Sequence, residues 1–445
     1  MSITCGIDWA EAHHDVAVMD EHGQVLGRLR IDTGSAGFVQ LMGLLAEHTN
    51  NVQAVPVAIE TDKNLLIVAL QGAGLVVHAI NPRALARYRE RHGQAGKKSD
   101  PGDAALLADV LRTDRHQHRP LPALTEDARA VRALARQHQE AVWALQVTMN
   151  RLRSVLLEFH PQALVAFPNL RHKAALAVLS AASTPALGKA LTKRKVVALL
   201  HGCGRRNDPA LVEQILRDLH TDNLRQPAPV ELALGHAVLA LLAVLTGMHA
   251  AVDLLKQALA VQFDDHPLAP VLRSAPGLGP LLGARVLAEV GDDPARFPTP
   301  DGLRAFAGTA PVTRASGRSR LVRARHIRNK RLADACHWWA FAMLTKSAGA
   351  RDHYDRRRAA GDHHNAALRN LANKLLGRLW WCLQHHELWD DTAAWPRLQQ
   401  VPTEPPLDSD SRGTSMSRRG RVGATPRSSS TPTPAGSWAG RSPQP

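Results

Sequence analysis

The heptapeptide KKSDPGD, residues 97–103, is expected to open a helix. Pro101 suits the first helical position, and Ser99 or Asp100 just before it can cap the helix. Asp100 and Asp103 are then neighbours on the first turn, where two carboxylates repel each other unless a cation lies between them. Acids also complement a helix N-terminus without any cation, so this segment alone is better explained as a capped surface helix.

Two further acids upstream change that interpretation, because each stands at the end of a short apolar run. Asp8 follows the run 3–7, and Glu60 ends the run 55–60. Runs of this length and composition are typical of buried strands. Four acids in the order Asp8, Glu60, Asp100, Asp103 therefore predict one metal site built from two strands and a helix.

The composition indicates a polyanionic partner. The chain has 445 residues and a formal charge of +15, with a pI near 10.4, which favours nucleic acid first and an acidic membrane second. No apolar run is expected to be long enough to span a bilayer, and the N-terminus does not resemble a signal peptide. Four scattered cysteines without metal-ligand spacing predict buried free thiols in a reducing cytosol.

The first 120 residues alternate predicted strands and helices. Three strands come first, followed by helix, strand, helix, strand and the helix of Asp100, which is the element order of an RNase H-like α/β domain with a mixed sheet. In that fold the ends of the first and fourth strands lie side by side. The predicted strands are 3–7, 15–19, 25–31, 53–60 and 75–80, and the predicted helices between them are 38–46 and 65–73.

Residues 121–265 are predicted to be a helical region that serves oligomerisation. Thr125 caps a long helix, and an irregular basic stretch is expected over 160–225. A heptad repeat then follows, which fits an antiparallel hairpin within one chain and an intermolecular coiled coil equally well. Its members are Leu234, Val238, Leu241, Leu245, Met248, Val252, Leu255 and Leu259.

Residues 266–395 are predicted to form a mainly α-helical domain that contacts nucleic acid. A Pro-Gly-x-Gly turn at 276–279 enters a helix, where backbone amides can meet a phosphate. The tract 314–331 holds eight Arg or Lys and no acid, which fits a phosphodiester cradle around a Ser-Gly-x-Ser turn. The predicted nucleic-acid contacts are Lys97, Lys98, Gly277, Gly279, Arg314, Arg318, Arg320, Arg323, Arg325, Arg328, Lys330 and Arg331.

Two features of the C-terminal part have simpler interpretations. Trp380 and Trp381 lie among leucines at helical spacing, so they are predicted to belong to the core rather than to stack on bases. Residues 396–445 are rich in Pro, Ser, Thr, Gly and Arg, which predicts a disordered basic tail.

Together these motifs resemble the DEDD-type insertion-sequence transposases of the IS-one-ten group, whose N-terminal domain is like the Holliday-junction resolvases. The resemblance runs from about residue 1 to 390 in the right order. The motifs that carry it are GIDWA at 6–10, IET at 59–61, KSDPGDA at 98–104, PGLGP at 276–280 and SGRS at 316–319.

The resemblance implies an RNA-guided DNA recombinase that acts on donor and target DNA as a homo-oligomer, expected to be a tetramer. It implies that Asp8, Glu60, Asp100 and Asp103 hold Mg²⁺, with Mn²⁺ as a possible substitute. It also implies a serine nucleophile, carried here to Ser316, with Ser319 as the alternative. A chain of this kind is expected in the cytoplasm, on the nucleoid when bound to DNA, and not in a membrane.

Three other functions stay open from the sequence. A metal-dependent nuclease or junction resolvase would hydrolyse DNA without a covalent protein–DNA intermediate. A sugar kinase of the actin-like fold also opens with a Gly-Ile-Asp strand, but it needs glycine-rich phosphate loops that do not occur here. A non-catalytic nucleic-acid-binding descendant of a transposase is disfavoured by the four acids.

Overall fold

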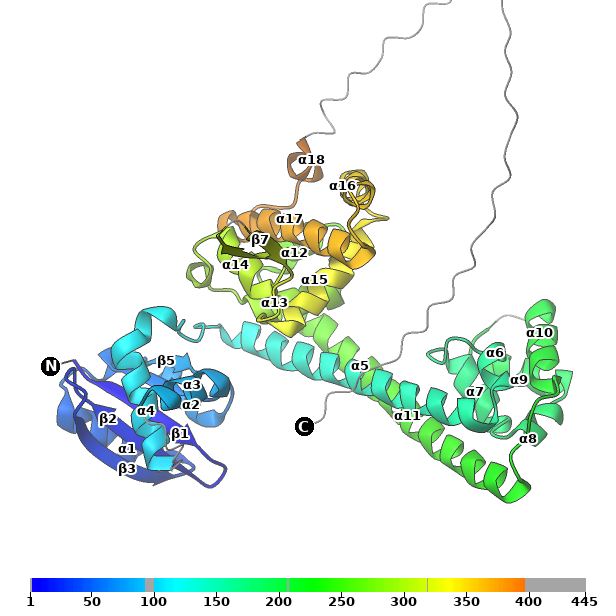
Figure 1. Ribbon diagram of the computed structural model, residues 1–445, viewed down its shortest axis with the longest axis horizontal. Coiled ribbons are helices and arrows are strands. Elements are labelled where there is room, and N and C mark those ends of the chain that lie inside the picture. Colours follow the sequence, from blue (N-terminus) through cyan, green and yellow to red (C-terminus); the bar gives the residue numbers. More distant parts are fainter. Residues whose placement is uncertain (1, 93–99, 206–207, 318, 397–445) are drawn as a thin grey trace, which may run out of the picture. The chain divides into compact units, whose positions relative to one another are not determined.

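The computed structural model describes residues 2–92, 100–205, 208–317 and 319–396, and the described residues belong to one compact unit, residues 1–398 (Figure 1). Three predicted nucleic-acid contacts lie outside the described residues: Lys97, Lys98 and Arg318. The predicted basic tail also lies outside them from residue 397 onward. The expected domain boundaries at 120 and 265 stay predictions.

The N-terminal part contains the mixed sheet that the sequence predicts. Its strand order is β3-β2-β1-β4-β5. β1 pairs antiparallel with β2 and β2 with β3, whereas β1, β4 and β5 are parallel neighbours. A tight turn joins β2 to β3, in which the Gly23 amide donates a hydrogen bond to the Asp20 carbonyl. The strands are β1 (Thr4–Trp9), β2 (His13–Met19), β3 (Val25–Asp32), β4 (Pro56–Ile59) and β5 (Val76–Ala79).

Helices pack around this sheet (Figure 1) and cover both of its faces. The helices are α1 (Ser35–His48), α2 (Leu65–Gly72), α3 (Pro82–His92) and α4 (Asp100–Asp114). α1 and α2 pack their leucines against Cys5, Ile7 and Val18. α4 covers the other face, where Gly6 and Ala58 leave room for its close approach. Because strand residues alternate between faces, Asp8 shares the α4 face with Gly6, and Trp9 shares the opposite face with Ile7.

The middle of the chain is an intrachain antiparallel helix pair. α5 (Glu126–Phe159) and α11 (Ala228–Asp264) run side by side. Val131 at the start of α5 packs with Phe263 at the end of α11, and Leu152 near the end of α5 packs with Val238 near the start of α11. The hairpin alternative is therefore present, and all eight heptad residues are buried or half-buried.

The prediction of an irregular stretch over 160–225 is wrong, because most of these residues are helical. Its helices are α6 (Gln162–Ala166), α7 (Lys173–Ala181), α8 (Pro185–Lys189), α9 (Lys193–Gly202) and α10 (Pro209–His220). They surround the far ends of α5 and α11 and close a second apolar core. Side-chain caps begin three of them: Thr184, Thr192 and Asp208.

The expectation that no apolar run is long enough to span a bilayer is wrong for α11. Its length and composition would let it cross a membrane, although the core helix of a soluble protein meets the same criterion. The apolar character extends all round because alanines separate the heptad residues and large side chains lie on the outer face as well. The exposed ones are Val230, Leu232, Leu239, Val244, Leu254 and Val261.

The C-terminal part is mainly helical, as predicted, with one added hairpin. Trp339 lies fully buried in its core and donates a 2.9 Å hydrogen bond to the Pro276 carbonyl. Trp380 and Trp381 pack against this core, which confirms their predicted role. The elements are α12 (Ala269–Ser274), α13 (Pro280–Val290), α14 (Pro300–Ala307), β6 (Val312–Ser316), β7 (Ser319–Arg323), α15 (Lys330–Met343), α16 (Ala348–Ala359), α17 (His364–His385) and α18 (Asp391–Ala394).

Candidate functional site

The strand register brings the first two predicted acids to one edge of the sheet. Gly6 pairs with Ala58 and Ile7 with Ile59, so Asp8 and Glu60 follow at the next position of two parallel neighbours. Asp8 is half-buried on β1, and Glu60 is half-buried directly after β4. Both residues make interactions within the protein. The two carboxylates therefore belong to adjacent strand ends, as the sequence predicted.

The close approach of α4 to β1 brings the third predicted acid to the same edge. A Cβ on Gly6 would lie 2.0 Å from the Ala104 carbonyl oxygen and 2.5 Å from the Ala108 nitrogen, so only glycine allows this contact. Asp100 precedes Ala104 by one helical turn, and Asp8 follows Gly6 by two strand positions on the same face. The packing thus fixes the first turn of α4 over the strand ends.

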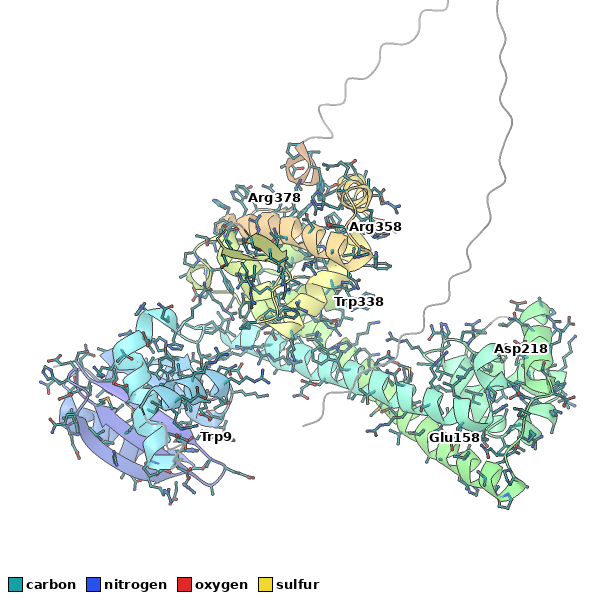
Figure 2. All side chains as sticks on the ribbon, viewed as in Figure 1. Trp9, Glu158, Asp218, Trp338, Arg358 and Arg378 are labelled. Atoms are coloured by element: carbon teal, nitrogen blue, oxygen red, sulfur yellow. The ribbon has the colours of Figure 1, made fainter. Side chains whose placement is uncertain are left out.

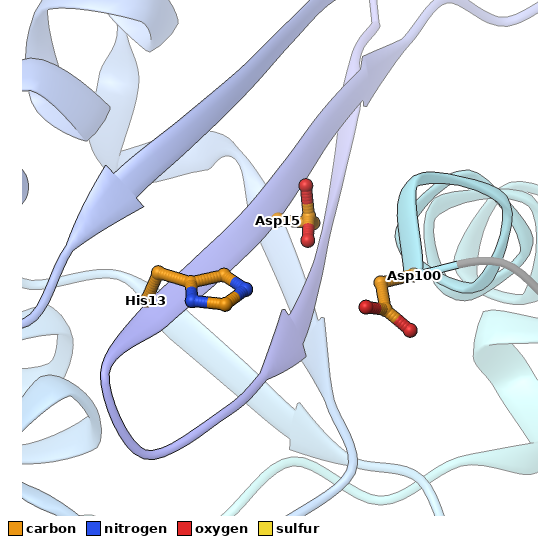
Figure 3. A group of neighbouring side chains, drawn as sticks. All are labelled: His13, Asp15 and Asp100. Atoms are coloured by element: carbon orange, nitrogen blue, oxygen red, sulfur yellow. The ribbon is translucent and has the colours of Figure 1, made fainter.

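A buried acid that the sequence analysis missed completes this edge. Asp15 on β2 lies directly opposite Asp8 in the antiparallel register. One possible ligand atom from each of His13, Asp15 and Asp100 lies within 4.8 Å of the others, and Figure 3 shows the three side chains turned toward one another. The available signal was the alternation His13, Asp15, Ala17 on the hairpin partner of the Asp8 strand.

Arg30 on β3 holds Asp15 in place. Its Nε and Nη2 donate to the two carboxylate oxygens of Asp15 at 3.1 and 2.8 Å. The hydrogen bonds to Asp15 raise the pKa of Arg30, and the nearby charge of Asp100 acts in the same direction. One guanidinium thus partly offsets the repulsion among the carboxylates at this edge.

Asp103, the fourth predicted acid, makes a different contact. Its Oδ1 accepts hydrogen bonds from Arg89 Nε and Nη2 at 3.1 and 2.7 Å, and the residue is 4% exposed. It lines a cavity of about 430 Å³ together with Arg89, Asp109 and Arg112. Among the described residues, Asp100 is the member of the predicted quartet that belongs to a compact cluster of metal-ligand atoms.

The two candidate nucleophiles lie together at an exposed hairpin turn. Ser316 ends β6 and Ser319 begins β7, and they form the last pair of the two-stranded ladder. Gly317 between them has φ 55°, a left-handed conformation that favours glycine. Both serines are exposed. The turn expected around this motif is present, within a hairpin that the sequence analysis did not predict.

The basic residues around the hairpin fall into two groups. Arg328 and Lys330 line a cavity of about 530 Å³ with His326, His337 and Arg369. Other exposed residues of the tract, Arg314 and Arg323, lie on the hairpin strands. Arg325 is half-buried, and the Arg320 backbone belongs to β7.

Arg331 and the glycine turn are more committed to the fold than the sequence suggested. Arg331 forms an ion pair with Glu140, and its Cζ lies 5.2 Å from the centre of the Trp143 ring. Both partners belong to α5, so the Arg331 charge already has partners within the protein. Gly277 has φ 82°, and a Cβ there would lie 3.2 Å from the Ala342 side chain. Gly279 is exposed and precedes α13 without a side-chain cap, which leaves that helix start accessible.

Comparisons with known proteins show which family the chain belongs to. Residues 5–161 match the IS110 DEDD model, described as a transposase, and residues 269–355 match the model of the transposase IS116/IS110/IS902 family. The "Mini-circle putative transposase for IS117" of Streptomyces coelicolor is 47% identical over 90% of this chain and 98% of its own length.

Two further relatives come from insertion elements. The IS110 uncharacterized 43.6 kDa protein of Streptomyces coelicolor is 30% identical over 76% of this chain and 80% of its own length. The IS900 uncharacterized 42 kDa protein of Mycobacterium paratuberculosis is 28% identical over 87% of this chain and 97% of its own length. The chain belongs to the IS116/IS110/IS902 family of transposases.

Proposed function

We propose that this chain cleaves and exchanges DNA strands of an insertion sequence, using the acid edge of its sheet and Ser316. The observation that supports the proposal most is the close contact of α4 with Gly6, because α4 begins at Asp100 and β1 and β4 lead to Asp8 and Glu60. The sheet order, with two antiparallel and two parallel pairings, supports an RNase H-like domain.

The donor set fits Mg²⁺, with Mn²⁺ as the substitute. Carboxylate oxygens are the ligands that Mg²⁺ prefers, and they suit Mn²⁺ as well. We assign the ion to Asp8, Glu60, Asp100 and Asp103, which requires Asp103 to exchange its contact with Arg89. Bound there, the ion would neutralise phosphate charge and activate the attacking oxygen.

In the proposed reaction, Ser316 Oγ attacks the DNA phosphorus while the bond from phosphorus to the leaving nucleotide oxygen breaks. The serine proton passes to solvent, and the leaving oxygen takes up a proton. Attack by a hydroxyl of the exchanged strand then reverses both steps and releases the serine. The phosphodiester energy is conserved in the serine ester, so strands are rejoined without an external energy source.

The basic cavity beside the hairpin would hold the phosphates during this exchange. Arg328, Lys330 and Arg369 supply positive charge there, and the exposed Arg314 adds to it on β6. The chain's net charge of +15 supports large nucleic-acid partners, which we take to be donor DNA, target DNA and a guide RNA. These partners would place the protein in the cytoplasm, on the nucleoid.

The outer face of α11 supports the oligomer, which we propose to be a tetramer. Leu254 is 69% exposed and Val261 is 67% exposed on a helix whose inner stripe already packs on α5. Exposed apolar residues in a row favour association with another copy. The intermolecular coiled coil is thus proposed in addition to the intrachain pair, with light scattering on the purified protein as its measurement.

The test is an adduct assay with end-labelled junction DNA, the RNA of the element's flank and Mg²⁺. We expect a protease-sensitive protein–DNA species that disappears in Ser316→Ala and in Asp100→Asn. Asp301→Asn is the matched control, because Asp301 is also a first-turn acid but is 85% exposed on α14.

The other outcomes assign the alternatives. An adduct lost in Ser319→Ala and kept in Ser316→Ala would move the nucleophile to the other strand of the same ladder pair. Cleaved DNA without an adduct, unaffected by either serine variant, would identify a metal-dependent nuclease and refute the covalent mechanism. Full activity without RNA would refute the guided reaction.

A further inference from the structure

A second cavity lies on the opposite face of the sheet from the acid cluster. Its volume is about 590 Å³, within the range of pockets that bind small ligands. It lies at the end of β1 between the starts of α1 and α2. The lining residues that matter here are Trp9, His14, Phe38, Asn64, Leu65 and Ala69.

The wall of this cavity exposes large apolar side chains to solvent. Trp9, labelled in Figure 2, is 43% exposed, and Leu65 is 85% exposed. The Trp9 ring lies 6.4 Å from the His14 ring with an angle of 22° between their planes, so one of its faces is supported by the protein. An exposed indole backed by a second ring is a suitable surface for stacking a flat aromatic group.

Two polar side chains of the wall have atoms without partners in the described part of the chain. His14 is 3% exposed, and its Nδ1 makes no hydrogen bond there. Asn64 Oδ1 accepts a 2.8 Å hydrogen bond from the Ile67 amide and caps α2, which leaves the buried Nδ2 as an unused donor. Buried polar atoms normally have partners, so a ligand that reaches Asn64 Nδ2 from this cavity would supply the missing acceptor.

The charge of the wall selects which part of a nucleotide can enter. Glu11 also lines the cavity and is exposed. Its carboxylate can accept a hydrogen bond from the amino group of a base, and it repels a phosphate. The cavity therefore fits an uncharged, flat, hydrogen-bonding group.

The position of the cavity relates it to the acid edge. Trp9 follows Asp8 directly, and strand alternation turns their side chains to opposite faces of the sheet. A nucleic-acid strand that passes the end of β1 near Asp8 therefore comes within one residue of the cavity mouth. A base can enter only when it is unpaired and turned out of its stack.

We propose that this cavity takes up one unpaired nucleobase, stacked on Trp9 and hydrogen-bonded by the Asn64 amide and the Glu11 carboxylate. The inference rests on the proposed function in one respect, that the ligand is a nucleic acid. DNA and RNA share this chemistry, and the two arms of the experiment distinguish them.

The experiment uses the full chain carrying Ser316→Ala, in buffer with EDTA, so that no strand cleavage contributes. Single-stranded DNA and RNA oligonucleotides with one 2-aminopurine are titrated, and its fluorescence and the anisotropy of an end label are recorded. We expect quenching of 2-aminopurine on binding. Trp9→Ala should abolish the quenching and weaken binding about 5- to 150-fold, the range for loss of one stacked base.

Two variants control for structure. Trp9→Phe keeps an aromatic face and should restore most of the quenching. Trp338→Ala removes another tryptophan of similar exposure, 47% on α15, and should behave as the parent chain. Duplexes should show no dependence on Trp9, because their bases are paired.

If Trp9→Ala loses quenching and binding with only one of the two oligonucleotides, that oligonucleotide identifies the bound strand as DNA or as RNA. The proposal is refuted if Trp9→Ala binds and quenches both oligonucleotides like the parent chain. It is also refuted if Trp338→Ala has the same effect as Trp9→Ala. A failure of the serine mechanism would leave these results unchanged, because the parent chain here lacks Ser316.

Discussion

Replacing Gly6 by alanine should separate α4 from β1. The new Cβ would lie 2.0 Å from the Ala104 carbonyl oxygen, and ordinary contacts begin at 3.4 Å, so the helix must withdraw by about 1.4 Å. Both nearest atoms belong to the backbone, which cannot turn aside as a side chain can. Overpacking of this kind costs about 1–3 kcal/mol of unfolding free energy.

The functional effect should exceed the effect on stability. A displacement of about 1 Å at a reacting group can reduce a rate about 100-fold, and Asp100 moves with the helix that Gly6 positions. We therefore expect Gly6→Ala to lower the melting midpoint by several degrees and to reduce adduct formation about 100-fold at a temperature where circular dichroism shows a folded protein.

Gly43→Ala is the matched control for this prediction. Gly43 is exposed on α1, and a Cβ there would meet no atom within 4 Å. Alanine favours a helix over glycine by about 1 kcal/mol, so this variant should be as stable as the parent or more so, with unchanged activity. Wild-type melting and wild-type adduct formation in Gly6→Ala would refute the argument that this contact positions Asp100.

Two further predictions concern the core. Burial, aided by the charge of Arg285, lowers the pKa of His138 to about 4 from 6.5, so stability is full above pH 6.5 and is lost as the pH falls toward 4. This group alone should cost about 2 kcal/mol between pH 8 and pH 5, and His138→Gln should flatten the acid limb of a urea-midpoint series. Trp339→Ala should destabilise by about 3–5 kcal/mol in the same assay, because it opens a cavity and leaves the Pro276 carbonyl unpaired. The first prediction is refuted if the urea midpoint of His138→Gln falls toward pH 5 as steeply as that of the parent chain. The second is refuted if Trp339→Ala has the same urea midpoint as the parent chain.

The sheet and its acid edge were largely predictable, because each strand is a separate apolar run and each acid stands at a run's end. Asp15 was missed because the alternation His13, Asp15, Ala17 does not by itself show what this face of β2 meets. Only the register with Asp8 and the contact with Arg30 show where it lies. The role of Arg89 beside Asp103 was missed for the same reason, since fourteen residues separate them.

The helical parts show a different limit of prediction. A heptad repeat fixes which face of α11 is buried but not which helix covers it, so the choice between α5 and another chain needed the three-dimensional structure. The helices over 160–225 are short, and only their caps, such as Thr184 before Pro185, were visible in the sequence. Ser316 and Ser319 could not be separated by sequence because they occupy one ladder pair.

α5 and α11 pack together but are far apart in the sequence, which has a consequence during synthesis. α5 ends at Phe159 and α11 begins at Ala228, so about 70 residues are made between them. At roughly 5–20 residues per second the apolar stripe of α5 waits about 3–14 s for its partner to begin. The sheet with α4 is complete by Asp114, so it can fold on the ribosome while the long helix is still exposed to chaperones.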